Sequence, residues 1–217
     1  MHKQHTHHAH AHAQPAHTEG NLIRWARYYD PVVKLITMGR ANAMRQRTAD
    51  LAHIQAGDRV LDVGCGTGDL TMVAKERAGN SGQVVGIDAS PEMIAVARQK
   101  AEAKGRAIDY RIGVIEALPF AENSFDVVVS SLMMHHLPDN LKTEGLAEIQ
   151  RVLRPNGHLL IVDFRAPDSL YSKFILTLFM HGGMQSGVAD LPAPVEKAGF
   201  HNISTGKLNM LALGYLS

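Results

Sequence analysis

The sequence comprises 217 residues, with 22 basic and 21 acidic side chains and a formal net charge of +1. This length is typical of a single domain, and 45% hydrophobic residues are enough to bury a substantial core. The balanced charge provides no electrostatic footprint for a nucleic-acid partner. The single cysteine, Cys65, excludes an intramolecular disulfide, and no apolar run reaches the length of a membrane span. The N-terminus lacks the apolar core of a secretory signal, so we expect a cytoplasmic protein.

Residues 1–20 differ in composition from the rest of the chain. They hold seven of the 13 histidines and show no apolar periodicity, so burial cannot offset the entropy cost of ordering them. We predict a disordered histidine-rich tail that binds nickel, copper or zinc loosely. The histidines have no fixed ligand spacing, so no catalytic metal is expected. Residues 21–217 should form one folded domain that opens with a helical cover over residues 21–55, with Pro31 at a helix start or break.

From residue 59 onward, short apolar runs alternate with helical stretches. The runs that suit buried parallel strands are residues 59–63, 84–87, 109–112, 125–130 and 158–162. The helical stretches between them are residues 69–78, 91–104 and 141–153. Two late runs, residues 202–207 and 210–216, are separated by only two residues and predict an antiparallel hairpin. The pattern therefore predicts an α/β fold with a seven-stranded, mostly parallel sheet and helices on both faces.

A glycine-rich turn, Gly64-Cys65-Gly66-Thr67-Gly68, joins the first strand to the following helix. Glycines at such a turn permit positive φ angles and let a ligand approach the backbone closely. The second predicted strand ends at Asp88, whose carboxylate can accept hydrogen bonds from both hydroxyls of a ribose. Ligands of open parallel sheets collect at the carboxyl ends of the strands, where these two features would meet. The sequence thus predicts a nucleoside-binding site.

Two details of the glycine turn favour a sulfonium ligand over a nicotinamide dinucleotide. The glycines are spaced G-x-G-x-G, and Asp69 stands where the dinucleotide fingerprint needs a third small residue. Asp62, two residues before the first glycine, would repel a pyrophosphate and attract a cationic sulfonium ligand that carries an amino group. An NAD-dependent oxidoreductase remains an alternative at this point.

Four motifs, in this order and spacing, resemble the class I S-adenosylmethionine-dependent methyltransferases, and within them the ubiquinone and menaquinone biosynthesis branch. They are LDVGCGTGD at residues 61–69, GIDASPEM at 86–93, EALPF at 116–120 followed by SFDVVV at 124–129, and RVLRPNG at 151–157. The resemblance covers roughly residues 28–199. It implies a Rossmann-like fold and S-adenosyl-L-methionine as the cofactor.

The resemblance also implies which residues contact the cofactor. Asp62 would lie near its amino group, Asp88 would bind the ribose, and Ala89 and Met93 would flank the adenine. The full implied set, from the methionine end to the adenine end, is Asp62, Gly64, Gly66, Thr67, Ser131, Asp88, Ala89, Met93, Val114 and Ile115.

The sequence departs from these relatives at three places. Many of them read Gly-Asp-Ala-Glu where this chain has Gly-Val-Ile-Glu at residues 113–116, so the adenine amino group loses a side-chain acceptor and weaker binding is expected. Their Glu-Phe-Ser after the fifth strand becomes Asp-Phe-Arg at residues 163–165, and only Tyr29-Asp30 remains of their opening segment. The methyltransferase class is unaffected by these changes, but the motifs no longer specify a quinone acceptor.

Three side chains are candidates for catalysis. His135 and His136 follow the fourth predicted strand, where a neutral imidazole can take a proton from an oxygen or carbon acceptor; the alternative is that this turn only caps the next loop. Tyr29 lies on a segment that can fold over the site. Apolar residues 170–180 predict either an ordinary packed helix or an apolar lid, and Arg165 either holds an anionic group of the acceptor or is an exposed structural arginine.

These observations predict an enzyme that transfers a methyl group to a small or lipid-like acceptor, because the short chain has no room for a large recognition domain. A quinone precursor or an amino-lipid is favoured, with peripheral contact to a membrane, and the atom methylated stays open. The alternatives are a non-catalytic module that binds S-adenosylmethionine or metal, and then the NAD-dependent oxidoreductase.

Overall fold

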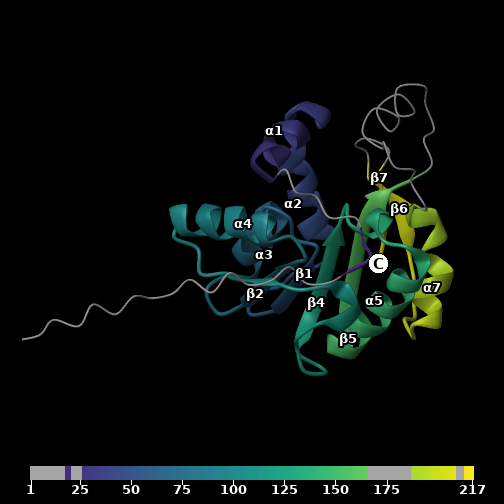
Figure 1. The fold of residues 1–217 in the computed structure, drawn as a ribbon. Coiled ribbons are helices and arrows are strands. Elements are labelled where there is room, and N and C mark those ends of the chain that lie inside the picture. The colour runs from purple at the N-terminus through teal and green to yellow at the C-terminus, as the bar shows by residue number, and fades with distance from the viewer. Residues whose placement is uncertain (1–17, 21–25, 166–186, 209–212) are drawn as a thin grey trace, which may run out of the picture.

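The computed structural model describes residues 18–20, 26–165, 187–208 and 213–217 (Figure 1). Most of the predicted tail and the apolar segment 170–180 lie outside these residues. In the described part of the chain, no helix combines the length and apolar character needed to cross a membrane.

A seven-stranded sheet forms the centre of the fold, with the strand order β3-β2-β1-β4-β5-β7-β6. Its strands are β1 (Arg59–Val63), β2 (Gln83–Asp88), β3 (Asp109–Ile112), β4 (Phe125–Ser131), β5 (Leu153–Phe164), β6 (Thr205–Lys207) and β7 (Leu213–Leu216). Strands β1 to β5 pair in parallel, whereas β7 runs antiparallel to both β5 and β6. The predicted mixed sheet with its closing hairpin is therefore confirmed.

Helices cover both faces of this sheet. They are α1 (Ala26–Ile36), α2 (Ala41–Leu51), α3 (Asp69–Ala78), α4 (Pro91–Ala103), α5 (Asp139–Val152) and α7 (Pro192–Lys197), with short 3₁₀ turns at Ile115–Ala117, Met134–His136 and Val188–Asp190. Helices α2 and α3 pack with the sheet in one apolar core, and α5 and α7 pack in a second core on the other face. Helix α1 lies above α4, away from the sheet (Figure 1).

The expectation for Pro31 was wrong, because this residue lies inside α1 rather than at its start or at a break. A proline has no N–H to donate to the carbonyl four residues earlier, which here belongs to Arg27 in the first turn of the helix. The carbonyl of Arg27 is close to the helix end and Arg27 is exposed, so water can replace the lost donor.

The strand order places a topological switch point between β1 and β4. Successive crossovers run outward from β1 to β2 and β3, and then in the opposite direction from β4 to β5. The loops that leave the carboxyl ends of β1 and β4 therefore diverge to opposite faces and leave a crevice between them.

Candidate functional site

Two adjoining cavities lie at the carboxyl ends of the strands. The first contains about 750 Å³ of space, open to solvent, and the second about 460 Å³. Both are lined by the residues Tyr29, Gly64, Gly66, Ser131 and Leu132. The two cavities therefore adjoin each other at these residues, in the crevice expected from the strand order.

The glycine turn after β1 forms the floor shared by both cavities. Gly64, Gly66 and Gly68 have φ angles of +75°, +53° and +80°, which a residue with a Cβ rarely adopts. A Cβ on Gly64 would also overlap the side chain of Met133. The N–H groups of Gly64 and Cys65 both donate to the carbonyl of Ile87, which ties the turn to the end of β2.

Asp88 is held rigidly at the end of β2. Its Oδ2 accepts a hydrogen bond from the N–H of Gly66 at 2.8 Å, and its Oδ1 accepts one from the N–H of Ser90 at 2.9 Å. Burial raises the pKa of Asp88 above its ordinary value, and these two backbone donors partly counter that effect. Each carboxylate oxygen keeps a further lone pair, and Asp88 lines the first cavity. The carboxylate can therefore accept hydrogen bonds from two hydroxyl groups of one ligand.

Asp62 lies on the wall of the second cavity, where it is only 1% exposed. The hydroxyl of Thr71 donates to its Oδ2 at 2.6 Å. Burial raises the pKa of Asp62 from 3.8 to about 7, while the hydrogen bond from Thr71 opposes that shift. A ligand cation at this end of the site would compensate the cost of the buried negative charge.

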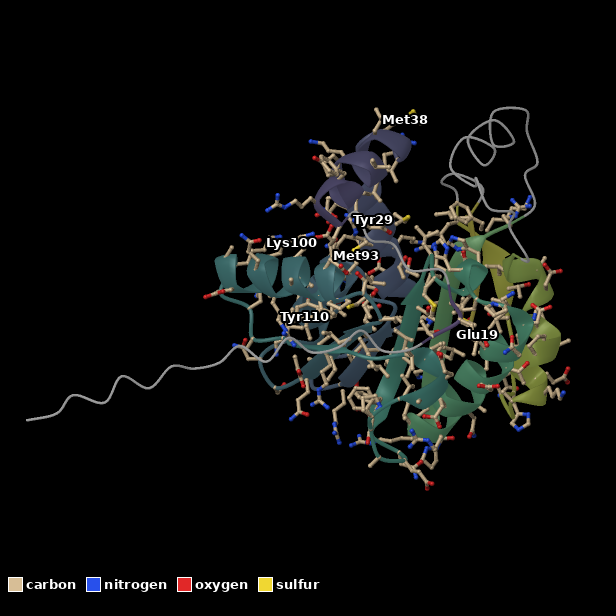
Figure 2. All side chains as sticks on the ribbon, in the orientation of Figure 1. Glu19, Tyr29, Met38, Met93, Lys100 and Tyr110 are labelled. Carbon is tan, nitrogen blue, oxygen red and sulfur yellow. The ribbon has the colours of Figure 1, made fainter. Side chains whose placement is uncertain are left out.

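Ala89, Met93 and Val114 line the far end of the first cavity with apolar surface. Ile115 also borders the first cavity, but its side chain packs against Gly145 of α5. A ligand in this cavity would therefore contact the backbone of Ile115 rather than its side chain. Figure 2 shows Met93 on α4 directly below Tyr29 on α1. A flat apolar ring fits between such walls.

The two histidines have different surroundings. His136 lines the first cavity, whereas His135 is buried and accounts for none of the described cavity wall. The ring Nδ1 of His135 lies 2.7 Å from Oδ1 of Asp163, and its backbone N–H donates to Oδ2 of Asp163 at 3.0 Å. The two imidazole rings are 3.9 Å apart between centroids. Burial, together with the neighbouring His135, lowers the pKa of His136 to about 4, so its imidazole is neutral near pH 7.

Helix α1 covers the site and is held by polar contacts. Thr67 donates to Oδ1 of Asp30 at 2.6 Å, and the ammonium of Lys100 donates to Oδ2 of Asp30 at 2.8 Å. Lys100 also pairs with Asp69, which in turn pairs with Arg45 of α2 at 2.9 Å. These contacts join α1 and α2 to the glycine turn and to α4, where Figure 2 shows Lys100 on the upper side.

Tyr29 projects from this cover to both cavities, whereas Tyr28 is 69% exposed and points away. Burial raises the pKa of Tyr29 to about 12, although Arg45 lowers it in part. The Tyr29 hydroxyl is therefore protonated near pH 7 and can donate a hydrogen bond, but it is not a base.

Sequence reasoning missed several residues of the site. Leu132 has a φ of +56° directly after β4 and borders both cavities, a strained position that no sequence pattern reveals. Thr18 and Gly20 line the first cavity rather than belonging to a disordered tail, because Gly20 packs beside Leu137. Glu116 also lines this cavity, although the first departure from the relatives had drawn attention to Val114, two residues before it.

The donor set fits an adenosyl sulfonium ligand. A buried carboxylate, Asp62, is available for a cationic amino group, a second one, Asp88, for a diol, and apolar walls for a purine ring. In addition, one carboxylate oxygen of Glu116 is buried without a hydrogen-bond partner in the described part of the chain. A pyrophosphate would instead meet these three carboxylates.

Comparison with known proteins agrees with this geometry. A profile of the methyltransferase domain matches residues 60–157. The demethylmenaquinone methyltransferase of Thermus thermophilus is 40% identical over 139 residues, which are 64% of this chain and 62% of that protein. The chain thus aligns with less than two thirds of the length of this relative. The demethylmenaquinone methyltransferase of Bacillus licheniformis is 30% identical over 198 residues, 81% of this chain and 84% of that protein.

Among solved structures, an S-adenosylmethionine-dependent methyltransferase from Aquifex aeolicus superposes with a TM-score of 0.66. It is 21% identical in sequence, and the superposition covers 86% of this chain and 95% of that one. At this identity the likeness concerns the fold alone.

Proposed function

The chain belongs to the class I S-adenosylmethionine-dependent methyltransferases of the menaquinone and ubiquinone biosynthesis branch, and from this premise we propose that it methylates a ring carbon of a quinone precursor. The relatives named for demethylmenaquinone support this acceptor. The observation that carries the proposal is that a neutral imidazole, His136, shares one cavity with the diol-accepting carboxylate Asp88. An amino-lipid is the second candidate acceptor, since an amine needs no base.

S-Adenosylmethionine supplies an electrophilic methyl group on a sulfonium. In the proposed reaction the bond between this methyl and sulfur breaks and a new bond forms to a ring carbon of the reduced, hydroxyl-bearing acceptor. The proton of that carbon then returns to the ring oxygen and restores the hydroxyl, so one proton in all is released. The protein's part is to align the two reactants and to exclude water, which alone lowers the barrier considerably. Ser131 and Leu132 border both cavities, and so we assign them to the point where the two reactants meet.

His136 would accept the proton of the acceptor hydroxyl. This transfer makes the ring carbon more nucleophilic, because the oxygen's electron pair is then shared with the ring. A pKa of about 4 makes His136 a weak base, and Asp163, whose charge raises that pKa, would stabilise the imidazolium that forms. His135 would position this turn through its two contacts with Asp163 and would not touch the acceptor.

We also propose that the protein is cytoplasmic and meets its lipid-like acceptor at a membrane surface. Tyr28 and Leu35 are 69% and 77% exposed on α1, seven residues apart and thus on one face of the helix. Arg27 and Lys34 are exposed beside them. Such a face suits peripheral contact with an anionic membrane. If this face contacts the membrane, the double variant Tyr28→Asn, Leu35→Asn should sediment less with anionic vesicles than the wild type does. Unchanged sedimentation would contradict the proposed membrane contact.

The proposed activity is tested with the purified full chain, S-adenosylmethionine and three acceptors: a reduced short-chain demethylmenaquinone, a reduced demethylubiquinone analogue and phosphatidylethanolamine. Release of S-adenosylhomocysteine and the product mass are measured. Turnover of a quinol supports the proposal, and turnover of only the amino-lipid favours the second candidate. Binding of S-adenosylhomocysteine without any turnover would indicate a non-catalytic binding module, and binding of NAD instead would indicate an oxidoreductase.

A matched pair of variants tests whether His136 acts as the general base. His136→Gln should lower the turnover of a quinol and leave the affinity for S-adenosylhomocysteine near that of the wild type, because a glutamine cannot take up the proton. His158→Gln serves as the control, since His158 lies on β5 outside both cavities of the site. Equal turnover of His136→Gln and the wild type would exclude His136 as the base.

A further inference from the structure

Tyr110 lies behind the glycine turn and lines neither of the two cavities of the site. It comes from β3, is only 2% exposed, and packs with Cys65 of the turn and with Ile94 and Ala97 of α4 in a small apolar cluster. Figure 2 shows Tyr110 below α4. The residue therefore supports the turn from the side that faces away from a ligand.

The hydroxyl of Tyr110 reaches the point where the turn becomes a helix. It donates a hydrogen bond to the carbonyl of Gly68 at 3.1 Å. The same carbonyl accepts the N–H of Met72 at 3.0 Å, which is the first hydrogen bond of α3. Burial raises the pKa of Tyr110 above its ordinary value, so the hydroxyl stays protonated and acts as the donor. The turn is thus held by a side chain that is distant in sequence.

Gly86 makes this reach across β2 possible. It stands opposite Tyr110 in the register of β2 with β3. A Cβ on Gly86 would come within 2.7 Å of Cδ1 of Tyr110 and within 3.0 Å of Sγ of Cys65, so the ring occupies the space that a side chain would need. The guanidinium of Arg98 donates two hydrogen bonds to the Tyr110 carbonyl and fixes this residue at the sheet edge. Tyr110 therefore joins β3 to the glycine turn across β2.

The part of the turn that Tyr110 holds belongs to one end of the site. Thr67 and Asp69, on either side of Gly68, line the second cavity, and neither of them lines the first. Asp62 on the wall of that cavity accepts the hydroxyl of Thr71, and Thr71 also acts on the Tyr110 hydroxyl and partly lowers its pKa. The contacts of Tyr110 therefore lead to the end of the site where a cationic amino group would bind.

We propose that Tyr110 is a positioning residue, which holds the glycine turn in the shape that binds the amino-acid part of S-adenosylmethionine. Gly86 serves the same purpose by leaving room for the tyrosine ring. This inference rests on S-adenosylmethionine as the cofactor and on the placement of its ammonium group at Asp62, and it does not depend on the methyl acceptor.

The opposite edge of the sheet offers a matched control. Tyr215 of β7 stands opposite Gly206 of β6, and a Cβ on Gly206 would overlap the tyrosine ring. This pair repeats the arrangement of Tyr110 with Gly86, but neither of its residues lines the two cavities of the site.

Calorimetric titrations with two ligands test the proposal. One is S-adenosylhomocysteine, and the other is 5′-methylthioadenosine, which keeps the adenine and ribose but lacks the amino-acid part. Tyr110→Phe should bind S-adenosylhomocysteine about 3- to 10-fold more weakly than the wild type, as expected for the loss of one neutral hydrogen bond, and should bind 5′-methylthioadenosine almost unchanged. Tyr215→Phe should bind both ligands like the wild type.

A second pair of variants perturbs the same contact from the neighbouring strand. Gly86→Ala should displace the ring and weaken S-adenosylhomocysteine selectively, whereas Gly206→Ala should leave both affinities unchanged; thermal melting shows that each variant is folded. The proposal is wrong if Tyr110→Phe weakens both ligands equally, which would indicate a general loosening, or weakens neither. The titrations contain no methyl acceptor, so a failure of the proposed quinone methylation would leave their outcome unaffected.

Discussion

Lowering the pH from about 8 to about 6 should weaken the binding of S-adenosylhomocysteine roughly tenfold, because Asp62 must be ionised to hold the ligand's ammonium group. Burial raises the pKa of Asp62 to about 7 in the free protein. Below that pH the carboxyl group is increasingly protonated, and the ionised fraction falls from about nine tenths at pH 8 to about one tenth at pH 6. The apparent dissociation constant rises in inverse proportion to this fraction.

The assay is calorimetric titration between pH 5.5 and 8.5 in buffers with different ionisation enthalpies, which also measures the protons released. Ligand binding should release close to one proton per site at pH 6 and few at pH 8. Asp62→Asn should bind weakly at every pH, with most of the pH dependence removed. Asp109→Asn, which changes an exposed carboxylate on β3, is the control.

The hydrogen bond from Thr71 provides a second check on the same reasoning. Thr71 lowers the pKa of Asp62, so Thr71→Val should move the midpoint of the pH dependence upward. An affinity that does not change between pH 6 and 8, or a wild-type pH profile in Asp62→Asn, would refute the placement of the ammonium group at Asp62.

Three other outcomes are expected. Asp88→Ala should weaken S-adenosylhomocysteine binding at least about tenfold without unfolding the protein, since it removes two ribose contacts; wild-type affinity by calorimetry would contradict its role. Asp62→Asn should be more stable than the wild type at pH 8, by on the order of a few kcal/mol, and the difference in Tm should vanish toward pH 4, because the raised pKa of Asp62 gives stability that is lost as the pH rises through about 7. Deleting residues 1–17 should leave turnover unchanged and remove most nickel binding, and a loss of turnover with intact folding would show that this segment serves the site.

The spacing of apolar residues along the chain and the residue types at its turns made the framework of this fold predictable. The bounds of β1 and β3 agree with the predicted runs. Strand β1 lies inside the sheet and is almost entirely buried, as expected for a parallel strand covered on both faces, whereas β3 is an edge strand with exposed side chains at Asp109 and Arg111. The glycine turn and Asp88 could also be located, since the turn needs positive φ angles and the strand end needs a carboxylate. Strand β5 begins earlier than expected, at Leu153, because this residue pairs with Phe125 across an irregularity in β4.

The rest of the site depends on contacts between segments that are distant in sequence. Nothing local distinguishes His135 from His136, yet Asp163 at the end of β5 draws one ring into the interior and leaves the other at the cavity. Likewise, the cavity wall at Glu116 follows from the way the 3₁₀ turn folds back after β3. The sequence alone could name these residue types but not the direction of their side chains.

The polar attachment of the cover has a consequence for the catalytic cycle. Helix α1 is joined to the glycine turn and to α4 through Asp30, Thr67 and Lys100, whereas the sheet beneath is held by apolar packing. Salt screens partly exposed ion pairs such as that of Lys100 with Asp30, and leaves buried apolar contacts almost untouched. Added salt should therefore speed the exchange of spent for fresh cofactor without loosening the domain. The residence time of S-adenosylhomocysteine becomes a property that ionic strength can tune separately from stability.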